Sequence, residues 1–580
     1  MNTQPVRSSE RRLGYMPAVD GLRAVAVAAV VVFHLGAAWL PGGFLGVDVF
    51  FVISGFLITS LLLAEHRATG TIRLGRFWMR RARRLLPAVF LMMALTLTVM
   101  LALHPDEVAR LRGQVVAAVF YVINWHFIIV DVPYFEQFGR PSVFLHLWSL
   151  AIEEQFYLVW PLALLGLLAV LGRRWIAGLV VVGIAASTLL GWWLWDPFAD
   201  TNRVYYGTDV RAVALLVGVL LALVLTPRPG FLGSRLRMAV AIPGAVVLGL
   251  AFALLDEQHS SLYRGGLLAV AVASAAVIAA AADSGTLVAR ALRTPVMVWI
   301  GLRSYGIYVW HWPVIVLTTP GTDVPIDGAP LAVVRVVAIL LIAAASYRWV
   351  ELPIRRGGMG AVRAGLDRLQ RRLGRGWRLA ATAAVPVYAA GLIVAVAVAP
   401  NAALQPPLGQ AAPTPATTAV RASVPAPILI GDSVMLSAQP QLQRRLGADA
   451  VIDAEVGRRF AEGAALARAY LRELPDRRDL VIHLGNNYFI RPDEIDRFLA
   501  GLDREVRVVL ITVRVPLPWE GSVNRTLAAA GDFPNVSILD WHGQSGDPGL
   551  LVDGAHMAPS GARRYADAVA GALESQANAQ

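Results

Sequence analysis

The stretch GGFLGVDVFFVISGFLIT, residues 42–59, contains a single charged side chain, that of Asp48. A helix of about 20 apolar residues spans the hydrocarbon core of a bilayer. Similar stretches recur over the first 400 residues, and the 580-residue chain is 56% hydrophobic with a mean hydropathy of +0.57. We therefore expect a polytopic α-helical membrane domain. Its eleven predicted spans are 17–40, 44–64, 85–103, 146–171, 175–195, 208–225, 238–255, 262–282, 297–318, 331–350 and 379–399.

The positive charges predict how these spans are oriented. The net charge is +12 and every basic residue except histidine is an arginine. Arginines cluster before the first span and in the connections after even-numbered spans, most densely at 355–378, whereas 319–330 has none. By the positive-inside rule the N-terminus is cytoplasmic, and eleven crossings place the C-terminal part outside. This topology explains the basic charge without nucleic acid as a partner. The stretch around 115–130 is predicted to be re-entrant or interfacial.

The composition changes to Ala, Pro, Thr and Gln at 400–427, which predicts an extended linker. Beyond it, apolar runs predict strands of a parallel sheet, with helices between them, in a three-layer α/β domain at 428–580. The predicted strands are 428–430, 480–484, 507–513 and 536–539, and the predicted helices include 458–473 and 493–503. The chain has no cysteine, which excludes disulfides, thiolate nucleophiles and Cys-based zinc sites.

The first C-terminal strand ends on GDS, residues 431–433, a junction well suited to exposing a nucleophile. Serine needs a base to take its proton, and histidine does so best when a carboxylate fixes its tautomer. The motif DGAH places Asp553 and His556 three residues apart, so one turn can present both. Ser433, His556 and Asp553 are therefore candidates for nucleophile, base and orienting acid.

Two further motifs supply donors for an oxyanion. EVGRRF contains Gly457, and HLGNN places Asn487 directly after a predicted strand. The backbone N–H groups of Ser433 and Gly457 and the side-chain amide of Asn487 can donate together. Each motif alone is common, but their order resembles the SGNH hydrolase family, with Asn486 as a departure where threonine often sits. The resemblance implies either ester hydrolysis or acyl transfer onto sugars.

Ionisable residues also occur inside the predicted spans, where they are costly and are functional candidates by default. GLRAVAVAAVVVFH places Arg23 and His34 eleven residues apart, on one helical face and about 16 Å apart along the axis. HLWSLAIEEQFYLVWPL places His146, Ser149 and Glu153 on another face, with Glu154 beside them. The simpler alternative for the first pair is an Arg23 that snorkels to the inner surface and a His34 near the outer one.

Three more stretches complete the pattern of the membrane domain. They are GLRSYGIYVWHWPVI with Arg303, Ser304, Tyr305 and His311, RWVELPIRR with Glu351 and Pro353, and FWMRRARRLLP with Arg80, Arg81, Arg83 and Arg84. The arginine run has two interpretations, either topology and lipid headgroups or an anchor for an anionic, phosphorylated donor.

Together these motifs resemble the acyltransferase 3 family of integral membrane proteins over roughly 15–356. The resemblance implies transfer of acyl groups, commonly acetyl from cytoplasmic acetyl-coenzyme A, toward extracytoplasmic glycans, without a metal. It matches Arg23, His34, the arginine run and the Glu153–Glu154 pair to family positions. The fusion to an SGNH domain resembles bacterial O-acyltransferases of peptidoglycan, lipopolysaccharide and other envelope glycans, and predicts a multi-pass protein of the bacterial cell membrane.

The hypothesis from the sequence is an acyl relay. Acyl-coenzyme A binds near the arginine run, His34 acts as general base or transient carrier, Glu153 orients or gates, and Ser433 receives the acyl group outside. Two alternatives remain open: a membrane-anchored carbohydrate esterase, and a transporter or flippase with a tethered esterase domain. The predicted segments are a tail at 1–14, the membrane domain at 15–356, a basic connection at 357–378, an eleventh helix at 379–399, the linker at 400–427 and the SGNH domain at 428–580.

Overall fold

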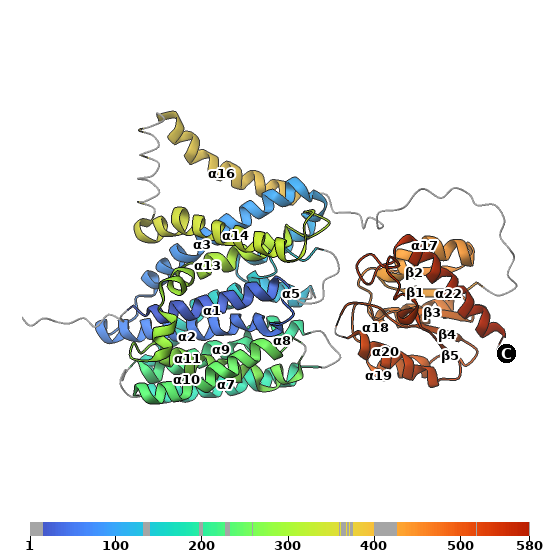
Figure 1. The fold of residues 1–580 in the computed structure, drawn as a ribbon, viewed down its shortest axis with the longest axis horizontal. Coiled ribbons are helices and arrows are strands. Elements are labelled where there is room, and N and C mark those ends of the chain that lie inside the picture. Colours follow the sequence, from blue (N-terminus) through green and yellow to red (C-terminus); the bar gives the residue numbers. More distant parts are fainter. Residues whose placement is uncertain are drawn as a thin grey trace, which may run out of the picture. The chain divides into compact units, whose positions relative to one another are not determined.

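The computed structural model describes residues 15–130, 140–196, 201–226, 233–257, 259–358, 360, 367, 371, 375–399, 426–517 and 519–578. The chain forms two compact units that divide near residue 403. The N-terminal unit is all helical, and the C-terminal unit is α/β (Figure 1). Most of the predicted basic connection at 357–378 and of the predicted linker at 400–427 lies outside the described residues.

Within the described residues, nine helical segments are long and apolar enough to cross a membrane. They contain the helices α1 (Pro17–His34), α2 (Gly46–Thr69), α3 (Leu74–Leu103), α6 (Leu147–Val170), α7 (Arg173–Leu194), α9 (Thr208–Leu225), α10 (Ser234–Leu254), α11 (Leu267–Ala281) and α14 (Gly328–Ser346). The polytopic helical class predicted from the sequence is therefore confirmed, with nine of the eleven predicted spans in this set.

The other two predicted spans, 297–318 and 379–399, are helical but do not meet the same criterion. The first is α13 (Pro295–Val316), long enough to cross a membrane but less apolar because it contains Arg303, Ser304 and His311. The second lies in α16 (Arg375–Val398), within which Pro386–Val398 is the apolar segment found among the described residues. Nine predicted spans therefore meet the criterion among the described residues, and the total of eleven stays a prediction.

The stretch predicted to be re-entrant forms two short helices, α4 (Arg112–Val119) and α5 (Ile123–Ile129). Tyr121 between them has φ +54°, a left-handed conformation that breaks the helix. Neither helix is long enough to span the hydrocarbon core.

Close contacts between helices hold the N-terminal unit together. A Cβ atom at Gly55 on α2 would overlap the carbonyl of Leu215 on α9, so only glycine allows these backbones to approach. Gly301 on α13 meets the carbonyl of Asp20 on α1 in the same way. These contacts set the relative positions of α1, α2, α9 and α13, which Figure 1 shows side by side.

The C-terminal unit is built on a five-stranded parallel sheet in the order β2-β1-β3-β4-β5. Its strands are β1 (Ile428–Gly431), β2 (Val451–Ala454), β3 (Asp479–His483), β4 (Arg507–Ile511) and β5 (Val536–Leu539). The four predicted strands and the parallel arrangement are confirmed. Strand β2 is not among the predicted strands, because its sequence, VIDA, is short and interrupted by Asp453.

Helices cover both faces of this sheet (Figure 1). One face carries α17 (Ser433–Leu446) and α22 (Pro559–Asn578), which contact each other, and the other carries α18 (Phe460–Glu473), α19 (Pro492–Ala500) and α20 (Glu520–Ala529). The sheet order reverses beside β1, and Gly431 at its end is paired with Ala454 and His483. In open parallel sheets the site lies beyond the carboxyl ends of the strands at such a reversal.

Candidate active sites

Ser433 stands at the end of β1 and is the first residue of α17. The β1 residues Ile428, Leu429 and Ile430 are fully buried, so the strand is held in place on both faces. The carboxylate of Asp432 caps α17 by accepting from the N–H of Val434 at 3.0 Å. The chain therefore turns sharply at Ser433 and presents its hydroxyl at the edge of the sheet.

The predicted triad is assembled. Nε2 of His556 lies 3.0 Å from Oγ of Ser433, and Nδ1 of His556 lies 2.6 Å from Oδ2 of Asp553. A carboxylate can only accept, so Nδ1 carries the proton and Nε2 is left to accept from the serine hydroxyl. The structure thus brings together the three residues predicted from GDS and DGAH.

The turn around Asp553 fixes this carboxylate. Its Oδ1 accepts from the backbone N–H groups of Ala555 at 3.0 Å and His556 at 2.8 Å. Partial burial acts to raise the pKa of Asp553, but hydrogen bonds from the side chain and backbone of His556 outweigh it and lower that pKa to about 2. Asp553 is therefore ionised over the whole physiological range and holds one tautomer of His556.

The predicted oxyanion donors occupy the loops that follow the strands beside β1. Gly457, with φ +79°, lies in the loop after β2, and Asn487 lies in the loop after β3. The side-chain nitrogen of Asn487 is buried and has no hydrogen-bond partner among the described residues. Because burying an unpaired amide costs free energy, this nitrogen is a donor suited to a bound oxyanion. Its neighbour Asn486 instead donates to both oxygens of Asp432, at 3.1 and 3.0 Å.

Arg458 is a residue of this site that the sequence did not single out. Its side chain is buried, and its guanidinium donates to the carbonyls of Gly431 at 3.1 Å and Asp453 at 2.6 Å and to Oδ1 of Asp453 at 2.6 Å. It therefore ties the end of β1, which carries Ser433, to the end of β2, from which the Gly457 loop departs. Its place directly after Gly457 in EVGRRF was the available signal.

In the N-terminal unit a cavity opens among the helices. Four residues singled out in the sequence line this cavity from three different helices: Arg23, Arg81, Arg84 and Glu153. Ser149 and Tyr308 line it as well, and their hydroxyl oxygens lie 2.5 Å apart. The wall therefore combines several guanidinium groups with hydroxyls and apolar side chains.

The four arginines predicted from FWMRRARRLLP do not act alike. Arg81 and Arg84 are half-buried and line the cavity, and Arg81 also stacks over the ring of Tyr157 at 5.3 Å. Arg80 and Arg83 are exposed and do not line it; Arg80 lies 3.6 Å from the carboxylate of Glu65. Two of the four arginines therefore line the cavity, because consecutive helical positions point in different directions.

Glu153, rather than Glu154, faces the cavity. Its Oε1 accepts from the hydroxyls of both Ser54 and Tyr157, and Tyr157 also donates to Ser54 at 3.0 Å. This places the carboxylate in a network of hydroxyl donors between α2 and α6. The sequence could not distinguish the two glutamates because the direction of the cavity from this helix depends on how the neighbouring helices pack.

His34 ends α1 and does not line the cavity. Its Nδ1 lies 3.1 Å from Nε2 of His311 on α13. Tyr308, which lines the cavity, donates to the carbonyl of His146 at 2.9 Å, and its own carbonyl hydrogen-bonds to Nδ1 of His311. His311 was noted in the sequence only as part of a motif, and the contact with His34 becomes visible only when α1 and α13 pack together.

The comparisons with known proteins identify the N-terminal unit. A family model described as an acyltransferase domain matches residues 16–348, which is more than half of the chain. The chain belongs to the acyltransferase 3 family. The family resemblance predicted from the membrane motifs is thereby confirmed, as is the predicted enzyme class, an acyltransferase.

Relatives within this family extend over both units. Peptidoglycan O-acetyltransferase OatA of Listeria monocytogenes is 34% identical to this chain, with 95% of this chain and 97% of that protein aligned. A solved structure, the C-terminal catalytic domain of Streptococcus pneumoniae peptidoglycan O-acetyltransferase A with a methylsulfonyl adduct, is 24% identical. It covers 27% of this chain and 96% of its own, with a TM-score of 0.24.

Proposed function

We propose that this protein takes an acetyl group from cytoplasmic acetyl-coenzyme A and transfers it, through Ser433, to hydroxyl groups of peptidoglycan outside the cell membrane. The observation that carries the proposal is the complete Ser433–His556–Asp553 triad in the same chain as an arginine-lined cavity among apolar helices. The relative from Listeria, named as a peptidoglycan O-acetyltransferase and aligned over nearly the full length, supports the choice of acyl group and acceptor.

The cavity suits an anionic donor with a long reach. Arg23, Arg81 and Arg84 are gathered on its wall, and guanidinium groups bind phosphates through several parallel hydrogen bonds. The nearest carboxylate described for Arg23 is that of Asp20 at 3.6 Å. His34 lies eleven residues further along α1, about 16 Å by the helical rise. A donor that separates its phosphates from its thioester by an extended arm, as coenzyme A does, matches this spacing.

In the proposed inner step His34 receives the acyl group and Glu153 holds the cavity wall. The hydrogen bonds from Ser54 and Tyr157 keep the Glu153 carboxylate in place, and Tyr157 lies under the guanidinium of Arg81. Glu153 therefore positions one side of the donor site through its neighbours rather than reacting itself.

In the proposed outer step the triad works twice. His556 takes the proton of Ser433 as Oγ attacks the acyl carbonyl, and Asp553 stabilises the imidazolium that forms. Donors at Ser433, Gly457 and Asn487 hold the oxyanion. The oxyanion collapses to an acyl-serine when the bond to the group that delivered the acyl breaks, and that group leaves with the proton held by His556. A sugar hydroxyl then attacks, with His556 again as base, and Ser433 recovers its proton when the product ester departs.

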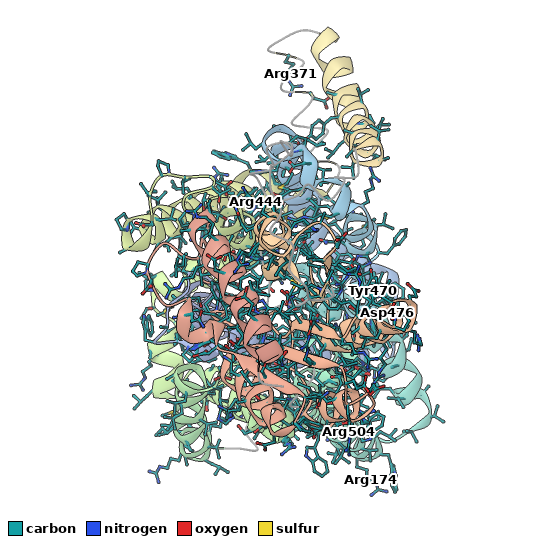
Figure 2. The ribbon with its side chains drawn as sticks, turned by 90° about the vertical axis from the view of Figure 1, so that its right-hand side faces the viewer. Arg174, Arg371, Arg444, Tyr470, Asp476 and Arg504 are labelled. Carbon is teal, nitrogen blue, oxygen red and sulfur yellow. The ribbon has the colours of Figure 1, made fainter. Side chains whose placement is uncertain are left out.

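The orientation rests on the arginines. Connections after even-numbered spans are basic. Arg174, at the start of α7, is one of these arginines, and its side chain is exposed at the surface of the helical bundle (Figure 2). The positive-inside rule then places these connections and the N-terminus in the cytoplasm. With an odd number of crossings before it, the C-terminal unit lies outside, on the acceptor's side.

Alkali-released acetate from purified peptidoglycan tests the proposal. Cells would carry the wild-type protein, Ser433→Ala or His34→Ala, each at matched membrane levels, and the acetate would be measured by mass spectrometry. We expect both variants to lose the acetate that the wild type adds. A rise in acetate with Ser433→Ala would instead identify an esterase. Transport of a lipid or sugar that survives His34→Ala without coenzyme A would identify a transporter.

A further inference from the structure

Three histidines from separate parts of the chain meet at one end of α1. His34 is the last residue of α1, His311 lies on α13, and His146 immediately precedes α6. The ring centroids of His34 and His311 are 5.1 Å apart, and those of His146 and His311 are 5.6 Å apart. The side chains of His146 and His311 are buried, whereas His34 is half-buried. His34 is thus the member of the cluster closest to solvent.

The hydrogen bonds of this cluster decide where its protons lie. A backbone carbonyl only accepts, so Nδ1 of His311, bonded to the carbonyl of Tyr308, carries a proton. Neutral His311 then has its lone pair on Nε2, which faces Nδ1 of His34 at 3.1 Å. Nδ1 of His34 must therefore be the donor in this contact, and the backbone of Val30 gives His34 a second hydrogen bond. The lone pair of His34 is left on Nε2.

We propose that His311 is the positioning residue for His34, holding the tautomer in which Nε2 is the nucleophilic nitrogen. This rests on the proposed function, in which His34 receives the acyl group. The arrangement repeats the geometry of a hydrolytic triad, with the carbonyl of Tyr308 fixing His311 and His311 fixing His34. His146 is held separately, by a hydrogen bond of 3.0 Å between its Nε2 and the carbonyl of Val309.

The chemistry of the inner step balances without a proton transfer to His311. Nε2 of His34 attacks the thioester carbonyl, the N–C bond forms, the C–S bond breaks and the thiolate leaves. The acylated ring of His34 is then a cation and the thiolate an anion, so charge is conserved. Nδ1 of His34 keeps its proton and donates it in the hydrogen bond to Nε2 of His311, which stabilises the cation. When the acyl group moves on, His34 is again neutral, with its proton on Nδ1 and its lone pair on Nε2.

A purely structural role for His311 would give a different dependence on side-chain chemistry. The aromatic contact with His34 is also made by Trp312, whose ring centroid lies 4.8 Å from it. The indole nitrogen of Trp312, however, donates to the carbonyl of Ser142 at 2.8 Å. Trp312→Phe is therefore a matched control that alters an aromatic neighbour of His34 but leaves the His34–His311 contact in place.

The kinetic test uses the full-length protein in lipid vesicles and follows release of free coenzyme A from acetyl-coenzyme A. His311→Leu removes the imidazole acceptor for Nδ1 of His34 and leaves His34 only its backbone hydrogen bond with Val30. We expect kcat to fall by about 10²-fold, less than the 10⁴-fold loss when a triad carboxylate is replaced. KM should stay within about twofold because the arginine cavity is untouched. His311→Gln can donate to Tyr308 and accept from His34, so it should retain activity within about tenfold of the wild type.

Three kinetic outcomes would overturn the inference. They are equal losses in His311→Leu and His311→Gln, a change confined to KM, and a His311→Leu protein with wild-type kcat. Trp312→Phe should remain near wild type, and a loss there equal to that of His311→Leu would show that packing, not the hydrogen bond, matters.

The tautomer can be observed without any change at His311. In protein labelled with ¹⁵N and ¹³C at its histidines, the signals of His34 are assigned by their absence in His34→Gln. We expect the unprotonated nitrogen of His34 to couple to both Cδ2 and Cε1, as Nε2 does. An unprotonated Nδ1 would contradict the inference regardless of how the variants fold.

The same experiments separate the inference from the proposed function. If His34→Gln keeps its coenzyme A release, His34 does not receive the acyl group, and the proposed inner step falls together with this inference. If His34→Gln loses release while His311→Leu keeps it, the proposed function stands and only the role of His311 is refuted.

Discussion

His556 in the C-terminal unit and His34 in the N-terminal unit are held in the same way by different partners. Nδ1 of His556 meets the carboxylate of Asp553 at 2.6 Å, and Nδ1 of His34 meets the imidazole of His311 at 3.1 Å. The Asp553 side chain is nearly half exposed to solvent, whereas His311 is fully buried among helices. His556 is therefore oriented by a charged group that is partly exposed to solvent, and His34 by a neutral group that is buried.

The difference follows from the cost of a carboxylate in an apolar bundle. Asp48, which is buried inside the bundle, faces Arg211 with contacts of 2.9 and 3.0 Å. A buried charge without such a partner is strongly unfavourable. An imidazole orients its neighbour without that cost, but it stabilises an imidazolium less than Asp553 does. His556 is thus suited to gain a proton as a base, and His34 is suited to react through its lone pair.

The largest expected effect tests the charged side of this comparison. Asp553→Asn should lower kcat by about 10⁴-fold because the amide favours the wrong tautomer of His556. Turnover of a soluble acetyl ester by the full-length protein measures this, with Asp547→Asn as an exposed control. If the fall in kcat were no larger than that of His311→Leu, the carboxylate of Asp553 and the imidazole of His311 would contribute equally as orienting groups, and the difference drawn between the two sites would be wrong.

The next effect concerns the ion pair that the membrane unit does contain. Asp48→Asn leaves Arg211 buried without its partner, and we expect the free energy of unfolding to fall by about 3–5 kcal/mol. Unfolding of the detergent-solubilised protein measures it. Asp209→Asn is the matched control, because Asp209 and Arg203 are each about one-third exposed and their pair should contribute no more than about 1 kcal/mol. Equal effects would show that burial does not set the cost of charge here.

A third effect tests charge burial next to the outer nucleophile. Burial raises the pKa of Asp432 to about 6, although hydrogen bonds from Asn486 and the N–H of Val434 act to lower it. A pKa raised on folding means that this residue favours the folded state most at low pH, and that this contribution falls as pH rises from 4 to 6. We expect the stability difference between wild type and Asp432→Asn to shift by about 2 kcal/mol between pH 4 and 7.

Hydrogen exchange of the β1 amides in the full-length protein reports this shift. The sign is the informative part, because the wild type should lose stability relative to Asp432→Asn as the pH rises. A difference that stays constant over the range would mean that Asp432 titrates near its usual value.

The smallest effect sharpens the account of the arginine run. Arg84 lines the cavity and its neighbour Arg83 is exposed, so the two form a natural pair of variants. Arg84→Ala should raise the KM for acetyl-coenzyme A by about tenfold, the scale of one charge-assisted phosphate contact. Arg83→Ala should change it less than twofold. Equal changes in KM in the two variants would indicate that the arginine run serves only topology and contact with lipid headgroups.

Much of this architecture was predictable because its signals are local. Long apolar stretches, their arginine-rich connections and the GDS, HLGNN and DGAH motifs each lie within one segment of sequence. Strand β2 and the buried Arg458 were missed because a four-residue edge strand and a clamp between two strands leave little local pattern. The sequence also could not separate Arg81 and Arg84, which line the cavity, from Arg80 and Arg83, since the direction of a helical side chain relative to a cavity depends on the neighbouring helices.

The sequence by itself determined that the chain combines a helical membrane unit with an α/β unit, and which serine, histidine and aspartate form the site in the C-terminal unit. Hydrophobic periodicity and short motifs are sufficient for that. Only the tertiary structure decided that His34 is held by His311, that Glu153 rather than Glu154 faces the cavity, and that two of the four arginines reach it. Those facts depend on how helices far apart in the chain rotate and pack, and side-chain direction at such contacts is set by the neighbours rather than by local sequence.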